Sequence, residues 1–207
     1  MTFGTTDAAL PATGTQYRLE RGDAVVVVAS LGGGLRSYTV AGTQLVETYA
    51  DESIPPSAAG ILLAPWANRI AGARWQLDGQ EQQLDVTEPK LQNAIHGLLR
   101  NTGYSLVEST PESVLLSAEI FPQHGYPFHL VHEVRYSLDA DGGLRVRQGL
   151  RNLGTRTAPF ALGAHPFLRL GEVPSEDLVL QVDAGTRLST DAALIPNGHV
   201  PAEGSDD

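Results

Sequence analysis

Two histidines in this sequence stand beside residues that restrict the backbone: His96 precedes Gly97, and His165 precedes Pro166. An imidazole titrates near neutral pH, so it can give or take a proton during a reaction. A lone histidine is more often structural, but neither of these lies in an alternating strand pattern. The neighbouring residues would fix the position of each imidazole ring, and this predicts a site for acid–base chemistry.

Side chains suited to binding a sugar occur in comparable segments. Asn68 and Arg69 follow Trp66, and Phe167 comes two positions after His165. Multidentate donors bind hydroxyl groups, and aromatic rings pack against the apolar faces of sugar rings. The two segments together therefore indicate a pocket for a monosaccharide.

Three other motifs have simpler interpretations. The glycines at 32–34 are followed by a strand pattern rather than a helix, so we interpret them as a turn and not as a phosphate-binding loop. The segment 139–143 begins like a calcium loop but lacks its later ligand and glycine positions, which indicates a hairpin turn. His129 and His132 are an odd number of positions apart on a predicted strand and point to opposite faces. We therefore predict no metal site and interpret His132 as a core residue.

Composition limits the class of protein. The chain has 207 residues, 42% of them hydrophobic and 18% charged, which fits one folded domain over residues 1–207. Its net charge of −10 argues against nucleic acid and anionic membrane surfaces as partners. There is no cysteine, so disulfides and thiolate chemistry are excluded. No targeting signal or membrane-spanning run is recognisable, so we expect a cytoplasmic protein.

The elements that must position these residues are short strands with a period of two. From residue 128 to 138, apolar side chains and His132 occupy alternate positions, and a Gly-rich turn then leads into a second alternating run. Residues 53–60 and those after Pro196 look like loops. The pattern predicts an all-β fold of two antiparallel sheets packed face to face. Strands are expected at Gln16–Glu20, Ala24–Ala29, Leu35–Val40, Trp75–Leu77, Ser105–Glu108, Val114–Ile120, Phe128–Leu138, Leu144–Arg151 and Leu178–Val182.

Several motifs, in order, resemble those of the aldose 1-epimerases, or mutarotases. Residues 60–70 contain a Pro-Trp-x-Asn-Arg-Ile block, residues 93–97 resemble its His-Gly block, and residues 159–168 resemble the block with the second histidine. The similarity runs from about Ala24 to Gly198. It implies a large antiparallel β-sandwich of the galactose mutarotase-like kind. It also implies an isomerase that needs no cofactor and interconverts the α and β anomers of a free aldohexose, such as galactose or glucose.

The resemblance also implies roles for individual residues. His165 would be the general acid that protonates the ring oxygen, and His96 would assist by a hydrogen bond near the same oxygen. Asn68 and Arg69 would hold ring hydroxyls, with Phe167 lining the pocket. Family members often have Tyr at the position of Phe167, so a hydroxyl contact is absent here.

The sequence departs from the family pattern toward its end. The family's sugar-binding aspartate and its base glutamate lie downstream of Asp207, and His199 stands where a family turn has Glu. Glu172, Glu176 and Glu203 do not fall in a matching motif. Three alternatives remain open at this point: the chain is a truncated member with a C-terminally incomplete sandwich, a second piece supplies the base, or water acts as the base.

Three rival functions are also compatible with the sequence. One is a hexose-6-phosphate 1-epimerase, which requires Arg74 or Arg100 to face the pocket. Another is a non-catalytic carbohydrate-binding β-sandwich, which the absent glutamate favours. The third is an inert fragment of a longer gene product.

Overall fold

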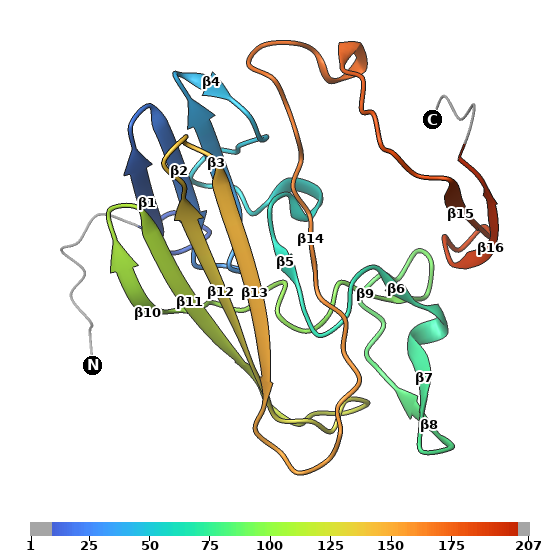
Figure 1. Ribbon diagram of the computed structural model, residues 1–207. Helices are drawn as coiled ribbons and strands as arrows, with labels where there is room; N and C mark the ends of the chain where they lie inside the picture. Colours follow the sequence, from blue (N-terminus) through green and yellow to red (C-terminus); the bar gives the residue numbers. More distant parts are fainter. Residues whose placement is uncertain (1–9, 203–207) are drawn as a thin grey trace.

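Strands dominate the protein in the computed structural model, which describes residues 10–202. Two four-stranded antiparallel sheets form its body (Figure 1). The first contains, in spatial order, β1 (Gln16–Arg21), β2 (Ala24–Ala29), β3 (Leu35–Val40) and β4 (Thr43–Gln44). The second contains β10 (Ser105–Thr110), β11 (Ser113–Ile120), β12 (Leu130–Leu138) and β13 (Leu144–Asn152). The predicted all-β class is confirmed.

Four separate two-stranded ladders lie outside these two sheets. They pair β5 (Leu62–Leu63) with β14 (Gly163–Ala164), β6 (Arg69–Ile70) with β9 (Ala94–Ile95), β7 (Arg74–Leu77) with β8 (Gln80–Gln83), and β15 (Thr186–Thr190) with β16 (Pro196–Pro201). Three short 3-10 turns complete the secondary structure: η1 (Pro56–Ala58), η2 (Ala71–Ala73) and η3 (Ser175–Asp177). Within residues 10–202, no helix is long and apolar enough to cross a membrane.

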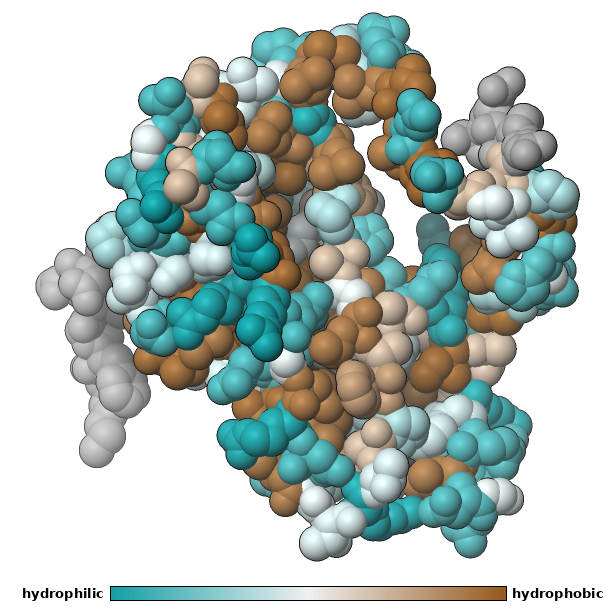
Figure 2. All heavy atoms as spheres, viewed as in Figure 1, coloured by the Kyte–Doolittle hydropathy of each residue, from teal (hydrophilic) through white to brown (hydrophobic). Residues whose placement is uncertain are grey.

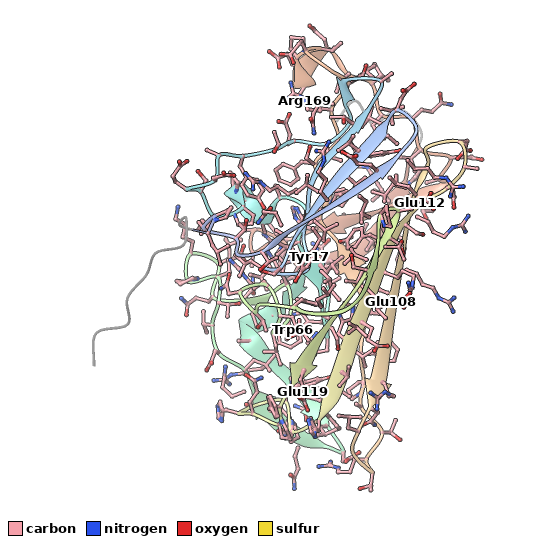
Figure 3. The ribbon with its side chains drawn as sticks, turned by 90° about the vertical axis from the view of Figure 1, so that its left-hand side faces the viewer. Tyr17, Trp66, Glu108, Glu112, Glu119 and Arg169 are labelled. Carbon is pink, nitrogen blue, oxygen red and sulfur yellow. The ribbon has the colours of Figure 1, made fainter. Side chains whose placement is uncertain are left out.

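The core lies where one face of each large sheet meets the other. Val26 of β2 and Val134 of β12 are fully buried in the same cluster, and all even positions of β12 are buried, as its alternation predicts. Burial of each aliphatic side chain in this cluster contributes roughly 1.5–3 kcal/mol of hydrophobic free energy. The Tyr136 hydroxyl also donates a 2.7 Å hydrogen bond to the Gly33 carbonyl, within the predicted glycine turn. Figure 3 shows the two sheets from the side, crossing obliquely.

Two predictions about the C-terminal third are wrong. The expected strand Leu178–Val182 forms no ladder, and Val179 and Leu180 are 93% and 77% exposed. Its apolar residues favour a strand, but a strand is stable only beside a partner, and none of the described residues provides one. The expected loop after Pro196 is instead β16, because β15 pairs with it as a hairpin. In Figures 1 and 2, the segment before this hairpin forms an arch with apolar residues on its surface.

The core histidine predicted on β12 has both ring nitrogens satisfied. The Gln148 amide donates to the Gly163 carbonyl (3.1 Å), which directs its oxygen to accept from His132 Nε2 at 3.1 Å. His132 Nδ1 therefore accepts from the Tyr104 hydroxyl, 2.8 Å away. Burial lowers the pKa of His132 from 6.5 to about 4, so the ring is neutral at pH 7. This network reaches Gly163, two residues before His165.

We predict that acid destabilises the protein through His132. Because the unfolded chain takes up this proton near pH 6.5 and the folded chain only near pH 4, stability is lost as the pH falls through this window. The loss amounts to roughly 3 kcal/mol over the window. Denaturant titrations from pH 7 to pH 4 should show a smaller pH dependence in His132→Gln than in the parent. The exposed His124 provides a control, and His124→Gln should keep the parent's slope. Equal slopes in His132→Gln and the parent would contradict the assignment.

Candidate active site

Strand β5 fixes the backbone of His165. Its ladder with β14 pairs Leu62 with Ala164 and Leu63 with Gly163. The pairing continues past β14, where His165 N–H donates to the Ile61 carbonyl (3.0 Å) and the His165 carbonyl accepts from Gly60 N–H (2.7 Å). Both backbone polar groups of His165 are thereby tied to the segment around β5.

The residues after β5 fix the backbone beside His96. Ala64 forms a parallel bridge with Gly97, and the Ala64 carbonyl accepts a 2.8 Å hydrogen bond from Leu98 N–H. Gly97 has a φ of +74°, and a Cβ on it would lie only 2.0 Å from the Ala64 carbonyl oxygen. Glycine is therefore required here, because any side chain would push His96 away from β5.

Asn68 and His96 both adopt the left-handed conformation, which is uncommon for residues other than glycine. Asn68 has a φ of 57° and His96 a φ of 64°. His96 N–H donates to the Asn68 carbonyl at 2.9 Å, across the end of the β6–β9 ladder. Conformations of this kind concentrate at functional sites, where the surrounding structure holds them.

The structure brings His96 and His165 into contact, although 69 positions (165 − 96) separate them in sequence. Their ring centroids are 5.0 Å apart and their planes meet at 76°. Burial, followed by the positive fields of His165, Arg100 and Arg69, lowers the pKa of His96 to about 4. Its buried Nδ1 has no hydrogen-bond partner among the described residues that could stabilise a charged ring. His96 is therefore neutral at pH 7.

Arg69 is held in place by Glu88. The guanidinium donates from Nε and Nη2 to the two carboxylate oxygens, both at 2.8 Å, and the Asn93 amide donates to the same carboxylate at 3.2 Å. Hydrogen bonds from Arg69 hold the pKa of Glu88 below its ordinary value. Glu88 is thus ionised, and both of its carboxylate oxygens accept hydrogen bonds. It orients Arg69 and is a weak base.

These residues border a cleft of about 880 Å³, within the range of roughly 300–1,000 Å³ that is usual for small-molecule sites. The side chain of Asn68 is exposed beside it and accepts a 3.0 Å hydrogen bond from Arg69 Nη1. The Phe167 ring lies 5.2 Å from that of His165. The lining consists of Ile54, Pro55, Ser57, Ala58, Arg69, Thr87, Glu88, Pro89, Lys90, Leu91, Ile95, His96, Arg100, His165 and Leu194.

Sequence reasoning missed Glu88. The sequence signals Glu88 only indirectly. A partly buried arginine such as Arg69 needs an acidic partner, but the sequence does not indicate which Asp or Glu that partner is. The carboxylates that the sequence did suggest lie elsewhere. Glu172 is 98% exposed and Glu176 is also exposed, neither borders the cleft, and Glu203 falls outside the described residues. His199 is an exposed residue of β16.

His129 and His132, near the start of β12, have separate hydrogen-bond partners and do not face a common site. His129 is bonded to Glu119, whereas His132 belongs to the core network described above. Across residues 10–202, no group of three or more potential ligands is placed to hold a metal ion.

Comparison with known proteins identifies the family. The sequence profile of aldose 1-epimerase matches residues 15–206, nearly the whole chain. The chain belongs to the aldose 1-epimerase family. It is 36% identical over 184 residues to the uncharacterized protein YihR of Escherichia coli (strain K12), covering 89% of this chain and 60% of YihR. It is 33% identical over 156 residues to galactose mutarotase of Rattus norvegicus, covering 70% of this chain and 43% of that enzyme. The chain thus spans about half the length of these two relatives.

Solved structures of the family share its fold. The aldose epimerase homologue from C. elegans superimposes with a TM-score of 0.77 at 18% identity, covering 92% of this chain and 63% of the other. Galactose 1-epimerase from Lactobacillus acidophilus NCFM gives a TM-score of 0.77 at 23% identity, covering 92% and 59%. At this identity the similarity shows the fold alone, and it confirms the galactose mutarotase-like sandwich.

We predict that Gly97→Ala disrupts the site and the fold together. Gly79 is a matched control, because its φ of +77° is similar but no atom lies within 4 Å of its hypothetical Cβ. Gly79→Ala should lose about 1–2 kcal/mol of unfolding free energy from backbone strain alone. Gly97→Ala should lose about 1–3 kcal/mol more of unfolding free energy than Gly79→Ala, because the added Cβ would collide with the Ala64 backbone. Denaturant titration measures both, and equal losses would show that contact with Ala64 does not constrain Gly97.

Proposed function

We propose that this protein interconverts the α and β anomers of an aldohexose of the galactose or glucose class. The observation that carries the proposal is the contact between His96 and His165 at one cleft, in a chain of the aldose 1-epimerase family. The 33% identity to a galactose mutarotase supports the same substrate class. No cofactor takes part in the proposed reaction.

In the proposed reaction, His165 is the general acid. The anomeric hydroxyl O1 loses its proton to a base, and the double bond between C1 and O1 forms as the bond between C1 and the ring oxygen breaks. His165, in its protonated form, gives its proton to the ring oxygen. Rotation about the C1–C2 bond and closure by the reverse steps yield the other anomer and restore the proton to His165.

His96 and the binding residues hold the sugar for this step. Because its pKa of about 4 keeps it neutral, His96 forms a hydrogen bond near the ring oxygen without competing as an acid. Arg69 uses three of its five N–H groups on Glu88 and Asn68, so two remain for sugar hydroxyls. Asn68 orients Arg69, and Phe167 packs beside His165 and supplies an apolar surface.

Water is the base in our proposal for this chain. Glu88 is the one carboxylate that borders the cleft among residues 10–202, and its ion pair with Arg69 makes it a weak proton acceptor. A positioned base typically contributes about 10²–10⁴-fold to rate. We therefore expect turnover that exceeds the buffer rate but falls short of that of a relative with a positioned base.

A non-catalytic sugar-binding module is the second candidate. The observation that favours it is the same lack of an unpaired carboxylate at the described cleft. In that case, Arg69 and the histidines would bind the sugar without accelerating its anomerisation.

Polarimetry of freshly dissolved α-galactose and α-glucose tests the proposal. The parent chain should accelerate mutarotation above the buffer rate, and His165→Ala should lose about 10²-fold or more of that acceleration because it removes the acid. Sugar affinity, measured separately by calorimetry, should change much less than the rate. The exposed His124 supplies the control, and His124→Ala should retain the parent's rate.

Two results would contradict this assignment. An unchanged rate in His165→Ala would remove His165 from the reaction. Sugar binding by the parent without any acceleration would favour the binding module instead.

A further inference from the structure

Strand β14, which leads into His165, is weakly held by its own ladder. It forms two residue pairs with β5, and Ala164 within it is exposed to solvent. A short, partly exposed strand opens locally more easily than a long, buried one. The backbone position of His165 therefore depends on any further contact that fixes β14.

Gln148 provides such a contact. It lies on β13, the edge strand of the second large sheet, and its half-buried amide donates the 3.1 Å hydrogen bond to the Gly163 carbonyl. Figure 1 shows the β5–β14 ladder beside the nine-residue β13. The bond therefore ties a two-residue strand to a long strand of the main body, on top of its pairing with β5.

Two buried side chains fix the direction of the Gln148 amide. His132 pairs with Leu150, two positions from Gln148 on β13, so both side chains lie on the inner face of the sheet. The Gln148 oxygen accepts from His132 Nε2, and His132 Nδ1 accepts from the Tyr104 hydroxyl. Turning the amide around would direct its oxygen at the Gly163 carbonyl oxygen, two acceptors with no proton between them. The network thus keeps the N–H group of Gln148 directed at β14.

The sugar-binding groups of the proposed site are anchored by other contacts. Arg69 is held by Glu88, and the Phe167 carbonyl accepts a 2.8 Å hydrogen bond from Glu47 N–H. Neither contact involves β13 or β14. Loss of the anchor on β13 would therefore displace His165 and leave these groups in place.

We propose that Gln148 is a positioning residue for His165, acting through the carbonyl of Gly163. The core network of His132 and Tyr104 keeps the Gln148 amide in the required orientation. The inference rests on the proposed function, in which His165 is the general acid. A displacement of about 1 Å in a reacting group can lower a rate by about 10²-fold, so the anchor acts on the reaction rate rather than on sugar binding.

Gln148→Glu in the full chain tests the inference at pH 7. The ionised carboxylate keeps the shape of the side chain and its acceptor for His132, but it has no N–H to donate to Gly163. In NMR hydrogen exchange, the His165 amide should exchange roughly tenfold faster than in the parent, measured relative to the fully buried Val134 of β12. The catalysed rate of mutarotation in polarimetry should fall by roughly tenfold or more, and the dissociation constant for galactose by calorimetry should change less than about twofold.

A second variant and a matched control accompany this test. Gln148→Met removes the donor and the acceptor together and should have effects in the same direction, and it serves in place of Gln148→Glu if the introduced charge prevents folding. Gln83 is also half-buried, donates from its amide to two backbone carbonyls and accepts from Arg74, but it does not border the cleft. Gln83→Glu should keep the parent's rate and the parent's exchange at His165.

The outcomes separate this inference from the proposed function. Unchanged exchange at His165, or faster exchange with the parent's rate of mutarotation, overturns the inference, while loss of activity in His165→Ala would still support the proposed function. An equal increase at His165 and Val134 also overturns it, because Gln148 would then support overall stability alone. Faster exchange at His165 in Gln148→Glu, when the parent itself does not accelerate mutarotation, upholds the anchoring of β14 and contradicts the proposed reaction.

Discussion

The site depends on one buried backbone segment, residues 61–64, which hydrogen-bonds to both histidine-bearing segments at once. On one side it holds His165 through the β5–β14 ladder, and on the other it holds the residues after His96 through Ala64. All four residues of the segment are buried, so water cannot replace these hydrogen bonds. The 5.0 Å separation of the two rings is therefore a consequence of main-chain pairing rather than of side-chain contacts between the loops.

Burial and nearby charges keep one of the two histidines, His96, in its neutral form. Two imidazolium rings at this distance repel one another, and burial penalises the charge further. At His96 these effects lower the pKa to about 4, and the nearby charges of Arg100 and Arg69 lower it further. Glu88 neutralises Arg69, whereas Arg100 has no ion-pair partner among residues 10–202. The arrangement thus combines a neutral imidazole at His96 with a surplus of positive charge at the cleft.

The sequence predicts the large sheets well, because β2, β11 and β12 bury alternate residues and their period of two is visible in the sequence. It does not predict β5 or β14, because two-residue strands have no period and are defined only by the partner they meet. Leu178–Val182 fails for the opposite reason, since it has strand-forming residues but no described partner. The histidines were recognisable from neighbours that restrict the backbone, whereas Glu88 was not, because its role comes from a contact with Arg69 across 19 positions.

The most direct test of this account is an NMR pH titration of the histidine rings, with His96 assigned through His96→Asn. If the two rings share one site, His96 should titrate at about pH 4 in the parent. Its pKa should rise in His165→Asn, because the neighbouring charge that lowers it is removed. A His96 that titrates near 6.5 in the parent, with a midpoint unchanged by His165→Asn, would show that the two histidines do not form one site.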